Sequence, residues 1–187
     1  YSLATTELAT WGEVELRFAD TNHVTASWIT PYPGFSAGQM ALTRLTTLAA
    51  ADTTSPLGAL TQCHSGSWFN TSQSGHGLQL EVLDQGGSKQ LIAVWYAFQG
   101  GKQRWLLGQG PIVGDSATLT TITTSGGEFP PAFNPANVVT QPWGTLCLRA
   151  IDGNHLRLDW SSSVAGFGGG GLDLTRLTSV GGHVCPQ

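Results

Sequence analysis

The sequence contains few charged residues. Its 187 residues include 8 Lys or Arg and 12 Asp or Glu, which gives a formal net charge of −4. A nucleic-acid-binding surface needs clusters of Lys and Arg, and only Lys89, Lys102 and Arg104 come near one another in the chain. We therefore expect no nucleic-acid partner.

Long apolar runs are also absent. No stretch approaches the roughly 20 residues that a membrane-spanning helix requires, so we expect no membrane insertion. The polar residues are mainly Ser, Thr, Gln, Asn and Gly, a composition typical of extracellular β-proteins. We expect a secreted or cell-surface protein, with the periplasm as the alternative, and a start at Tyr1 set by processing or by a chosen boundary.

Cysteine is scarce and odd in number. Cys63 and Cys185 flank one long segment, so a disulfide between them would tie its first strand to its last, while Cys147 lies mid-strand. Three cysteines allow three single bridges, and the other two stay open at this stage. No HExxH or paired-cysteine zinc pattern is present. We expect no cofactor and no metal, with His64, His76 and His183 as the alternative metal ligands.

The strongest signal is an internal repeat. Residues 11–46 align without a gap with residues 143–178, and about 16 of the 36 positions are identical. Residues 1–48 therefore match only the back three strands of the complete unit at 63–187, and the Ala/Thr/Ser/Pro-rich stretch 49–62 is predicted to be a linker. Three strands without their neighbours leave unpaired edges and an uncovered apolar face.

The fold is predicted to be all-β. Apolar and polar residues alternate with period two through the complete unit, and Gly-containing turns separate the strands. Eight antiparallel strands favour a barrel, with a sandwich as the alternative. Residues 91–98 are apolar at every position, which predicts a central strand covered on both faces. No segment is convincingly helical.

The repeat also assigns side chains to faces, because every second residue of a strand points to the same side. On this basis Trp28 and Trp160 point inward, as do Arg44 and Arg176, whereas Cys147 points outward. An inward Arg has to be paired or has to reach solvent at a strand end, and the second arrangement is the one we expect.

The most unusual segment is 66–77, which combines aromatic, amide, hydroxyl and His side chains. Aromatic walls with a few hydrogen-bonding groups are typical of small-ligand and sugar sites. The alternative is that the tryptophans are core residues. The candidate ligand-binding residues are Trp68, Asn70, Ser74, His76, Trp95, Tyr96 and Trp105.

Catalytic patterns are largely missing. The chain has no Gly-x-Ser-x-Gly elbow, and Ser74 and His76 have no evident third residue to orient the His. We name no catalytic residue. A secreted hydrolase with a site near Ser74 and His76 is the alternative function.

Several segments together resemble a family of secreted bacterial β-repeats of unassigned function. They are Gly66-Ser-Trp-Phe-Asn, Ser74-Gly-His-Gly, Val94-Trp-Tyr, Arg104-Trp-Leu, Gly127-Glu-Phe with Pro131-Ala-Phe-Asn-Pro, and Trp143-Gly-Thr-Leu. The resemblance spans 66–178 and, through the repeat, 11–46. It implies an exported tandem repeat but assigns no site residue, and Thr71 and His76 depart from its usual Pro and aromatic. At the level of fold alone, the unit is similar to avidin-like barrels.

These observations predict a non-catalytic extracellular module. It would bind a glycan or small ligand, or it would assemble through strand pairing, either with itself or with a chain that supplies the front of the first repeat.

Overall fold

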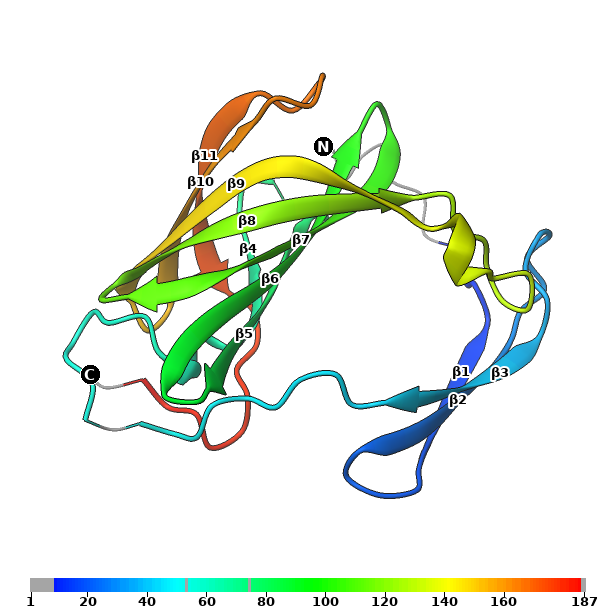
Figure 1. Cartoon of the computed structure of the whole chain (residues 1–187), viewed down its shortest axis with the longest axis horizontal. Coiled ribbons are helices and arrows are strands. Elements are labelled where there is room, and N and C mark those ends of the chain that lie inside the picture. The colour runs from blue at the N-terminus through cyan, green and yellow to red at the C-terminus, as the bar shows by residue number, and fades with distance from the viewer. Residues whose placement is uncertain (1–8, 53, 74, 186–187) are drawn as a thin grey trace. The chain divides into compact units, whose positions relative to one another are not determined.

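The computed structural model describes residues 9–52, 54–73 and 75–185. It confirms an all-β protein with a closed eight-stranded antiparallel barrel and a separate three-stranded antiparallel sheet (Figure 1). The three-stranded sheet comprises β1 (Glu13–Phe18), β2 (His23–Ile29) and β3 (Gly38–Thr43). The barrel comprises β4 (Gly66–Phe69), β5 (Gly77–Gln85), β6 (Ser88–Gln99), β7 (Lys102–Val113), β8 (Ser116–Ser125), β9 (Val139–Asp152), β10 (His155–Ser162) and β11 (Gly169–Arg176). Two 3-10 turns, η2 (Gln62–His64) and η3 (Pro135–Asn137), precede β4 and β9.

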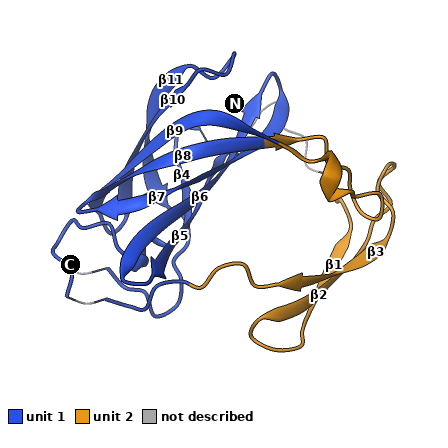
Figure 2. Cartoon of the chain, viewed as in Figure 1, with its two compact units in different colours: residues 1–4, 48–123, 140–187 blue, residues 5–47, 124–139 orange. Residues whose placement is uncertain are grey.

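The chain divides into two compact units (Figure 2). One contains residues 1–4, 48–123 and 140–187, and the other contains residues 5–47 and 124–139. The loop between β8 and β9 therefore groups with the three-stranded sheet. No helix among the described residues is long and apolar enough to span a membrane.

The barrel interior is filled by one face of every strand. Strand order is β10-β11-β4-β5-β6-β7-β8-β9, so each strand pairs with its sequence neighbour and β11 closes the ring on β4. Because side chains alternate between the two faces of a strand, the apolar positions of each strand gather inside. The fully buried residues include Trp68, Leu80, Leu91, Leu106, Leu119, Trp143, Leu146, Leu148, Leu156, Leu158 and Leu174.

Strand β6 corrects one expectation. Its inward residues are buried as expected, but Tyr96 on its other face is 56% exposed, so the prediction that residues 91–98 are covered twice is wrong. An apolar residue at every position does not require two covering layers, since the outer face of a barrel strand can keep aromatic groups in solvent.

The stretch 49–62, predicted to be a linker, is in part packed on the barrel. Ala49 and Leu60 are buried in its core, and their backbone N–H groups donate to the carbonyls of Val82 and Gly114 at 2.8 Å and 3.1 Å. Leu60 and η2 lie at the barrel end that carries the β7–β8 and β9–β10 turns, where they form a cap.

The three-stranded sheet repeats β9–β11 in detail. The inward parity predicted for Trp28 holds, since Trp28 is buried, and Cys147 is exposed as predicted. In both copies the hairpin carboxylate accepts from the backbone N–H two residues later, Asn22 in one case and Asn154 in the other, at 2.7 Å. Shared sequence therefore produces the same local structure even where the surrounding strands differ.

Candidate functional site

Two of the predicted ligand-binding residues come together at one end of the barrel. His76 precedes β5, and its Nδ1 accepts a long hydrogen bond of 3.4 Å from Nε1 of Trp95. The other ring nitrogen, Nε2, lies 3.2 Å from Oε1 of Gln73. This pattern fits a neutral imidazole that carries its proton on Nε2, and burial lowers the pKa of His76, which favours the same neutral form. We call this end of the barrel the mouth.

Trp68 does not reach the mouth. It is 1% exposed, and its Nε1 donates to the carbonyl of His64 at 2.9 Å in the cap at the opposite end. The Arg176 guanidinium lies 4.5 Å from the centre of the Trp68 ring, a cation–π arrangement. For Trp68 the alternative of a core residue is therefore the one that the structure supports.

Asn70 holds a loop together. Its Nδ2 donates to the carbonyl of Asp173 at 2.6 Å, and its Oδ1 accepts from the backbone N–H of Ser72 at 3.0 Å. Ser74, the other polar candidate in this loop, lies outside the described residues. The side chain of Asn70 thus holds the β4–β5 loop in place beside the mouth, and it does not itself face into the mouth.

Tyr96 and Trp105 lie on the outside of the barrel. They are paired across β6 and β7, and they are 56% and 49% exposed. Neighbouring residues on a strand point to opposite faces, so Tyr96 cannot join Trp95 in one interior site. Of the six candidates within the described residues, Trp68, His76 and Tyr96 line one pocket of about 340 Å³. Trp95 points into the barrel, Asn70 holds a loop, and Trp105 lies on the outer surface.

Most of the aromatic residues at the mouth were not among the predicted ligand-binding residues. Trp95 packs edge-on against Trp143 and Trp160, with ring centres 6.1 Å and 5.2 Å away. Phe167, in the β10–β11 loop, packs on Trp143 at 5.2 Å. The repeat carried a usable signal, since Trp143, Trp160 and Phe167 are all identical in the first copy, as Trp11, Trp28 and Phe35.

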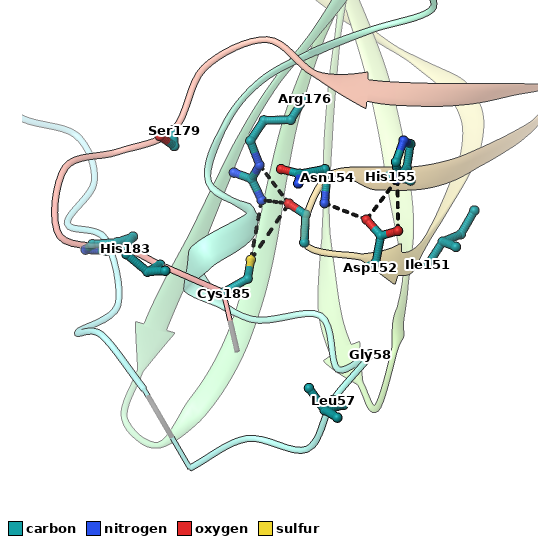
Figure 3. A pocket seen from close by; sticks show the side chains of 12 residues that line it. Leu57, Gly58, Ile151, Asp152, Asn154, His155, Arg176, Ser179, His183 and Cys185 are labelled. Carbon is teal, nitrogen blue, oxygen red and sulfur yellow. Dashed lines mark hydrogen bonds and ion pairs between the residues drawn. The ribbon is translucent and has the colours of Figure 1, made fainter. Parts of the chain in front are cut away.

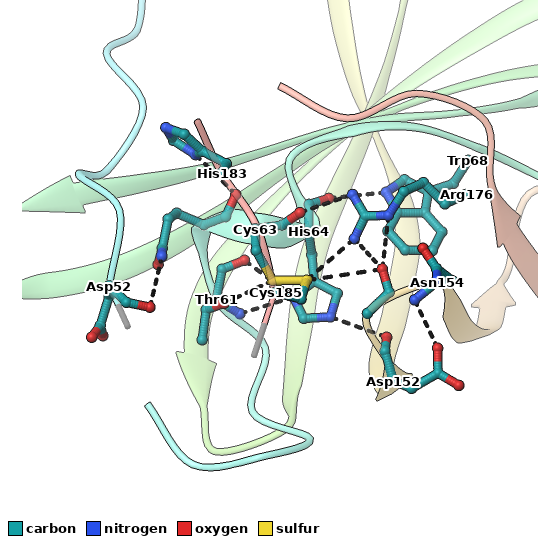
Figure 4. The surroundings of a disulfide bond; sticks show 12 residues. Asp52, Thr61, Cys63, His64, Trp68, Asp152, Asn154, Arg176, His183 and Cys185 are labelled. Carbon is teal, nitrogen blue, oxygen red and sulfur yellow. Dashed lines mark hydrogen bonds between the residues drawn. A yellow bond between two sulfur atoms is a disulfide. The ribbon is translucent and has the colours of Figure 1, made fainter. Parts of the chain in front are cut away.

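The cap end is held by a disulfide and an arginine (Figure 4). Cys63 and Cys185 are bonded, and Arg176 donates from Nη1 to the carbonyl of Cys63 at 2.8 Å and from Nε to the carbonyl of Gly153 at 2.7 Å. Arg176 ends β11 as predicted for an Arg at a strand end, but it is only half-exposed, and backbone carbonyls satisfy its donors in the cap. Burial lowers the pKa of its guanidinium.

His64 completes the cap as a neutral residue. Its Nδ1 accepts from the backbone N–H of Thr61 at 3.1 Å, and its Nε2 lies 3.3 Å from the carbonyl of Asp152. Burial lowers its pKa. His64 also lies close to Cys63 and Cys185, but both sulfurs are used in the disulfide, so this group does not fit a metal ion.

A cavity of about 560 Å³ opens beside the cap (Figure 3). Several of its polar side chains already have partners: Arg176 binds the carbonyls named above, and His155 Nδ1 lies 2.9 Å from the carboxylate of Asp152. The same pair recurs as His23 and Asp20 in the first copy. We interpret the pair as part of the repeated hairpin.

The second candidate site is one face of the three-stranded sheet, the face whose residues correspond to the inward-pointing residues of β9–β11 in the barrel. Val14, Leu16 and Phe18 on β1 are 61%, 54% and 74% exposed. Their copies in the barrel, Leu146, Leu148 and Ala150, are 0%, 0% and 5% exposed. Leu42 on β3 is also exposed, whereas its copy Leu174 is buried. We call Val14, Leu16, Phe18 and Leu42 the open face.

The edges of this sheet differ from the barrel in the same way. β1 and β3 are the two outer strands of the sheet among the described residues, whereas their copies β9 and β11 pair with β8 and β4. An exposed apolar face between two unpaired edges is an arrangement that soluble proteins normally avoid.

Comparison with protein-family models, with curated proteins and with solved structures finds no match for this chain. The resemblance to secreted bacterial β-repeats therefore stays a prediction, and function has to be argued from the two sites.

Proposed function

We propose that this chain is a non-catalytic assembly module in which β1–β3 receive the front five strands of another repeat and complete a second barrel. The observation that carries the proposal is the burial difference between the open face and its copies. The same positions, in the same register, are exposed in one copy and covered by β4–β8 in the other.

The repeat specifies what would cover the open face. In the barrel, Leu146, Leu148, Ala150 and Leu174 are buried by an antiparallel five-stranded meander whose outer strands also satisfy the edges of β9 and β11. A partner strand that satisfied only one edge would leave the face in water. We therefore commit to one occupant, a polypeptide segment with the strand pattern of β4–β8.

The energetics favour such an assembly. Burying one large apolar side chain contributes roughly 1.5–3 kcal/mol, and the open face offers three such side chains besides Val14. Backbone pairing along β1 and β3 would add direction and register, as in other cases of strand addition.

Arg44 gives independent support. Its copy Arg176 is used in the cap, where it stacks on Trp68 and bonds to backbone carbonyls. Arg44 occupies the same inward position but is exposed. In a completed second barrel, the added equivalent of Trp68 would lie beside Arg44, because Trp68 and Arg176 are partners across β4 and β11.

An extended chain tests this proposal. Residues 66–142 are placed directly before Trp11, in place of residues 1–10, because residue 142 precedes the copy of Trp11 in the natural barrel. We expect the backbone amides of β1 and β3 to become protected from hydrogen exchange, to a level similar to those of β9 and β11. The matched control is the same extended chain with Leu16→Glu, which places a charge inside the new barrel and should prevent protection.

Two outcomes would contradict the proposal. One is unchanged exchange of the β1 and β3 amides in the extended chain. The other is a dimer of the natural chain at micromolar concentration, detected by light scattering, in which the same amides are already protected. That dimer would make a second copy of the three-stranded sheet the occupant instead of a five-stranded meander.

The alternative of a hydrolase near Ser74 and His76 has less support. Both ring nitrogens of His76 face Gln73 and Trp95, and neither partner is a carboxylate that could orient the ring as a base. A secreted location and a glycan partner stay predictions from the sequence.

A further inference from the structure

A small pocket lies at the mouth of the barrel, at the end opposite the cap. Its volume is about 260 Å³, just below the range usual for drug-sized ligands, so it suits a single ring. It is lined by Gln73, His76, Trp95, Ala97, Phe98, Trp160, Gly166, Phe167 and Leu172. None of these residues is acidic, Lys or Arg, and burial lowers the pKa of His76, so the pocket suits an uncharged group.

The aromatic walls of the pocket are positioned by close packing. A Cβ at Gly170 would come within 2.4 Å of Cζ2 of Trp160, so the glycine allows the indole to lie against β11. The loop that carries Phe167 is tied to the end of β6, because Gln99 Nε2 donates to the carbonyl of Ala165 at 2.8 Å. Both walls are therefore fixed before any ligand arrives.

The first repeat shows what such a group of rings accepts. Trp11, Trp28 and Phe35 are the copies of Trp143, Trp160 and Phe167, and a phenyl ring packs among them: Phe129, from the β8–β9 loop. Its centre lies 6.0 Å from Trp11, 5.4 Å from Trp28 and 4.8 Å from Phe35.

The barrel lacks one of these three contacts. Trp95 takes the place of Phe129 against Trp143 and Trp160 at nearly the same distances, 6.1 Å and 5.2 Å. Among the ring contacts of the described residues, none joins Trp95 to Phe167, and both side chains line the mouth pocket. The pocket is thus the space in which a ring would meet Phe167 as Phe129 meets Phe35.

We propose that the mouth pocket binds the phenyl side chain of a peptide segment, presented as Phe129 is presented to the first repeat. This site is separate from the open face and does not depend on barrel completion. The bound ring would insert between Trp95 and Phe167, and Gln73 at the rim would supply amide groups for the peptide backbone. A phenylalanine satisfies the walls by edge-to-face contacts and leaves no charge to compensate.

The test is a titration of the full chain with a synthetic, end-capped peptide of residues 127–132, Gly-Glu-Phe-Pro-Pro-Ala, followed by calorimetry and tryptophan fluorescence. We expect weak saturable binding, and at least about tenfold weaker binding when the peptide carries Phe129→Ala, as loss of one buried phenyl ring implies. In the chain, Ala97→Leu fills the pocket without removing a contact and should abolish binding. Trp105→Ala, on the outer surface, is the matched control and should leave affinity unchanged.

Two results would overturn the proposal. The first is no binding up to millimolar peptide, and the second is binding that Ala97→Leu does not reduce. If binding of the second kind is lost with Phe35→Ala, the peptide has displaced the chain's own loop from the first repeat. A neutral monosaccharide series serves as the comparison: sugar binding lost with Ala97→Leu, without peptide binding, would assign the pocket to a glycan instead.

Discussion

Leu16 and Leu148 form a matched pair that measures how much the open face is covered. They are the same residue type at the same position of the two copies, and each is paired across its hairpin with the corresponding residue, Ala26 or Leu158. Leu148 is fully buried, whereas Leu16 is 54% exposed. The substitution Leu→Ala at both positions therefore changes the same atoms in two environments.

The expected magnitudes differ by a factor of two or more. Leu148→Ala removes three buried carbons and leaves a cavity in a filled barrel, which should cost about 2–5 kcal/mol of unfolding free energy. Leu16 is a little under half buried and can leave no cavity, so the transfer cost alone, about 0.8 kcal/mol per buried CH₂ group, gives roughly 1 kcal/mol. In the extended chain with a second complete barrel, the cost at Leu16 should rise to that at Leu148.

The assay has to follow the two units separately. Hydrogen exchange with mass spectrometry reports the opening free energy of β1–β2 peptides and of β9–β10 peptides in the same sample. Equal losses at Leu16 and Leu148 in the natural chain would show that the open face is already covered, and our reasoning about assembly would fail. A loss at Leu16 that stays near 1 kcal/mol in the extended chain would refute the second barrel.

Two predictions concern the cap. Reducing the Cys63–Cys185 bridge, whose cysteines are 122 residues apart in the chain, should lower the unfolding free energy by about 2–5 kcal/mol. Urea titrations with and without reductant measure this loss. A loss below about 1 kcal/mol would mean that η2 and its hydrogen bonds hold the cap without the disulfide. Burial lowers the pKa of His64 in the folded chain, so its contribution to stability is complete above the unfolded pKa of about 6.5 and is lost as pH falls through the folded pKa. The urea midpoint should accordingly fall between pH 7 and pH 5, and His64→Asn, whose Oδ1 can still accept from Thr61, should flatten that fall; an equal fall in the variant would place the sensitivity elsewhere.

The sequence predicted the strands and their faces because both follow from local pattern. Period-two alternation and the 132-residue offset between Trp11 and Trp143 were sufficient to place Trp28 on a buried face and Cys147 on an exposed one. Barrel closure was a preference over a sandwich, since it depends on β11 reaching β4, a pairing between strands far apart in the chain.

The candidate site was harder to predict because it depends on non-local packing. Grouping Trp95 with Tyr96 ignored the strand alternation that sends neighbours to opposite faces. Trp68 turned toward the cap because its indole N–H found the carbonyl of His64 there. Phe167 is a loop residue without periodicity: its identity with Phe35 marks a repeated position, but only the structure places that position at the mouth.

Phe129 explains why the first copy can tolerate an open face at all. Its ring packs on Trp28 and Phe35 and thereby covers the aromatic end of the three-stranded sheet, where the barrel uses Trp95. Phe129 does not extend this cover to Leu16 and Phe18, which stay exposed toward the other end of β1. A loop that caps one end and leaves the rest of the face apolar is what a sheet needs if it is to remain folded until its partner strands arrive. If β1–β3 had instead become an independent surface hairpin, no physical requirement would favour large apolar residues at these positions, and their persistence in the inward register argues for a covered final state.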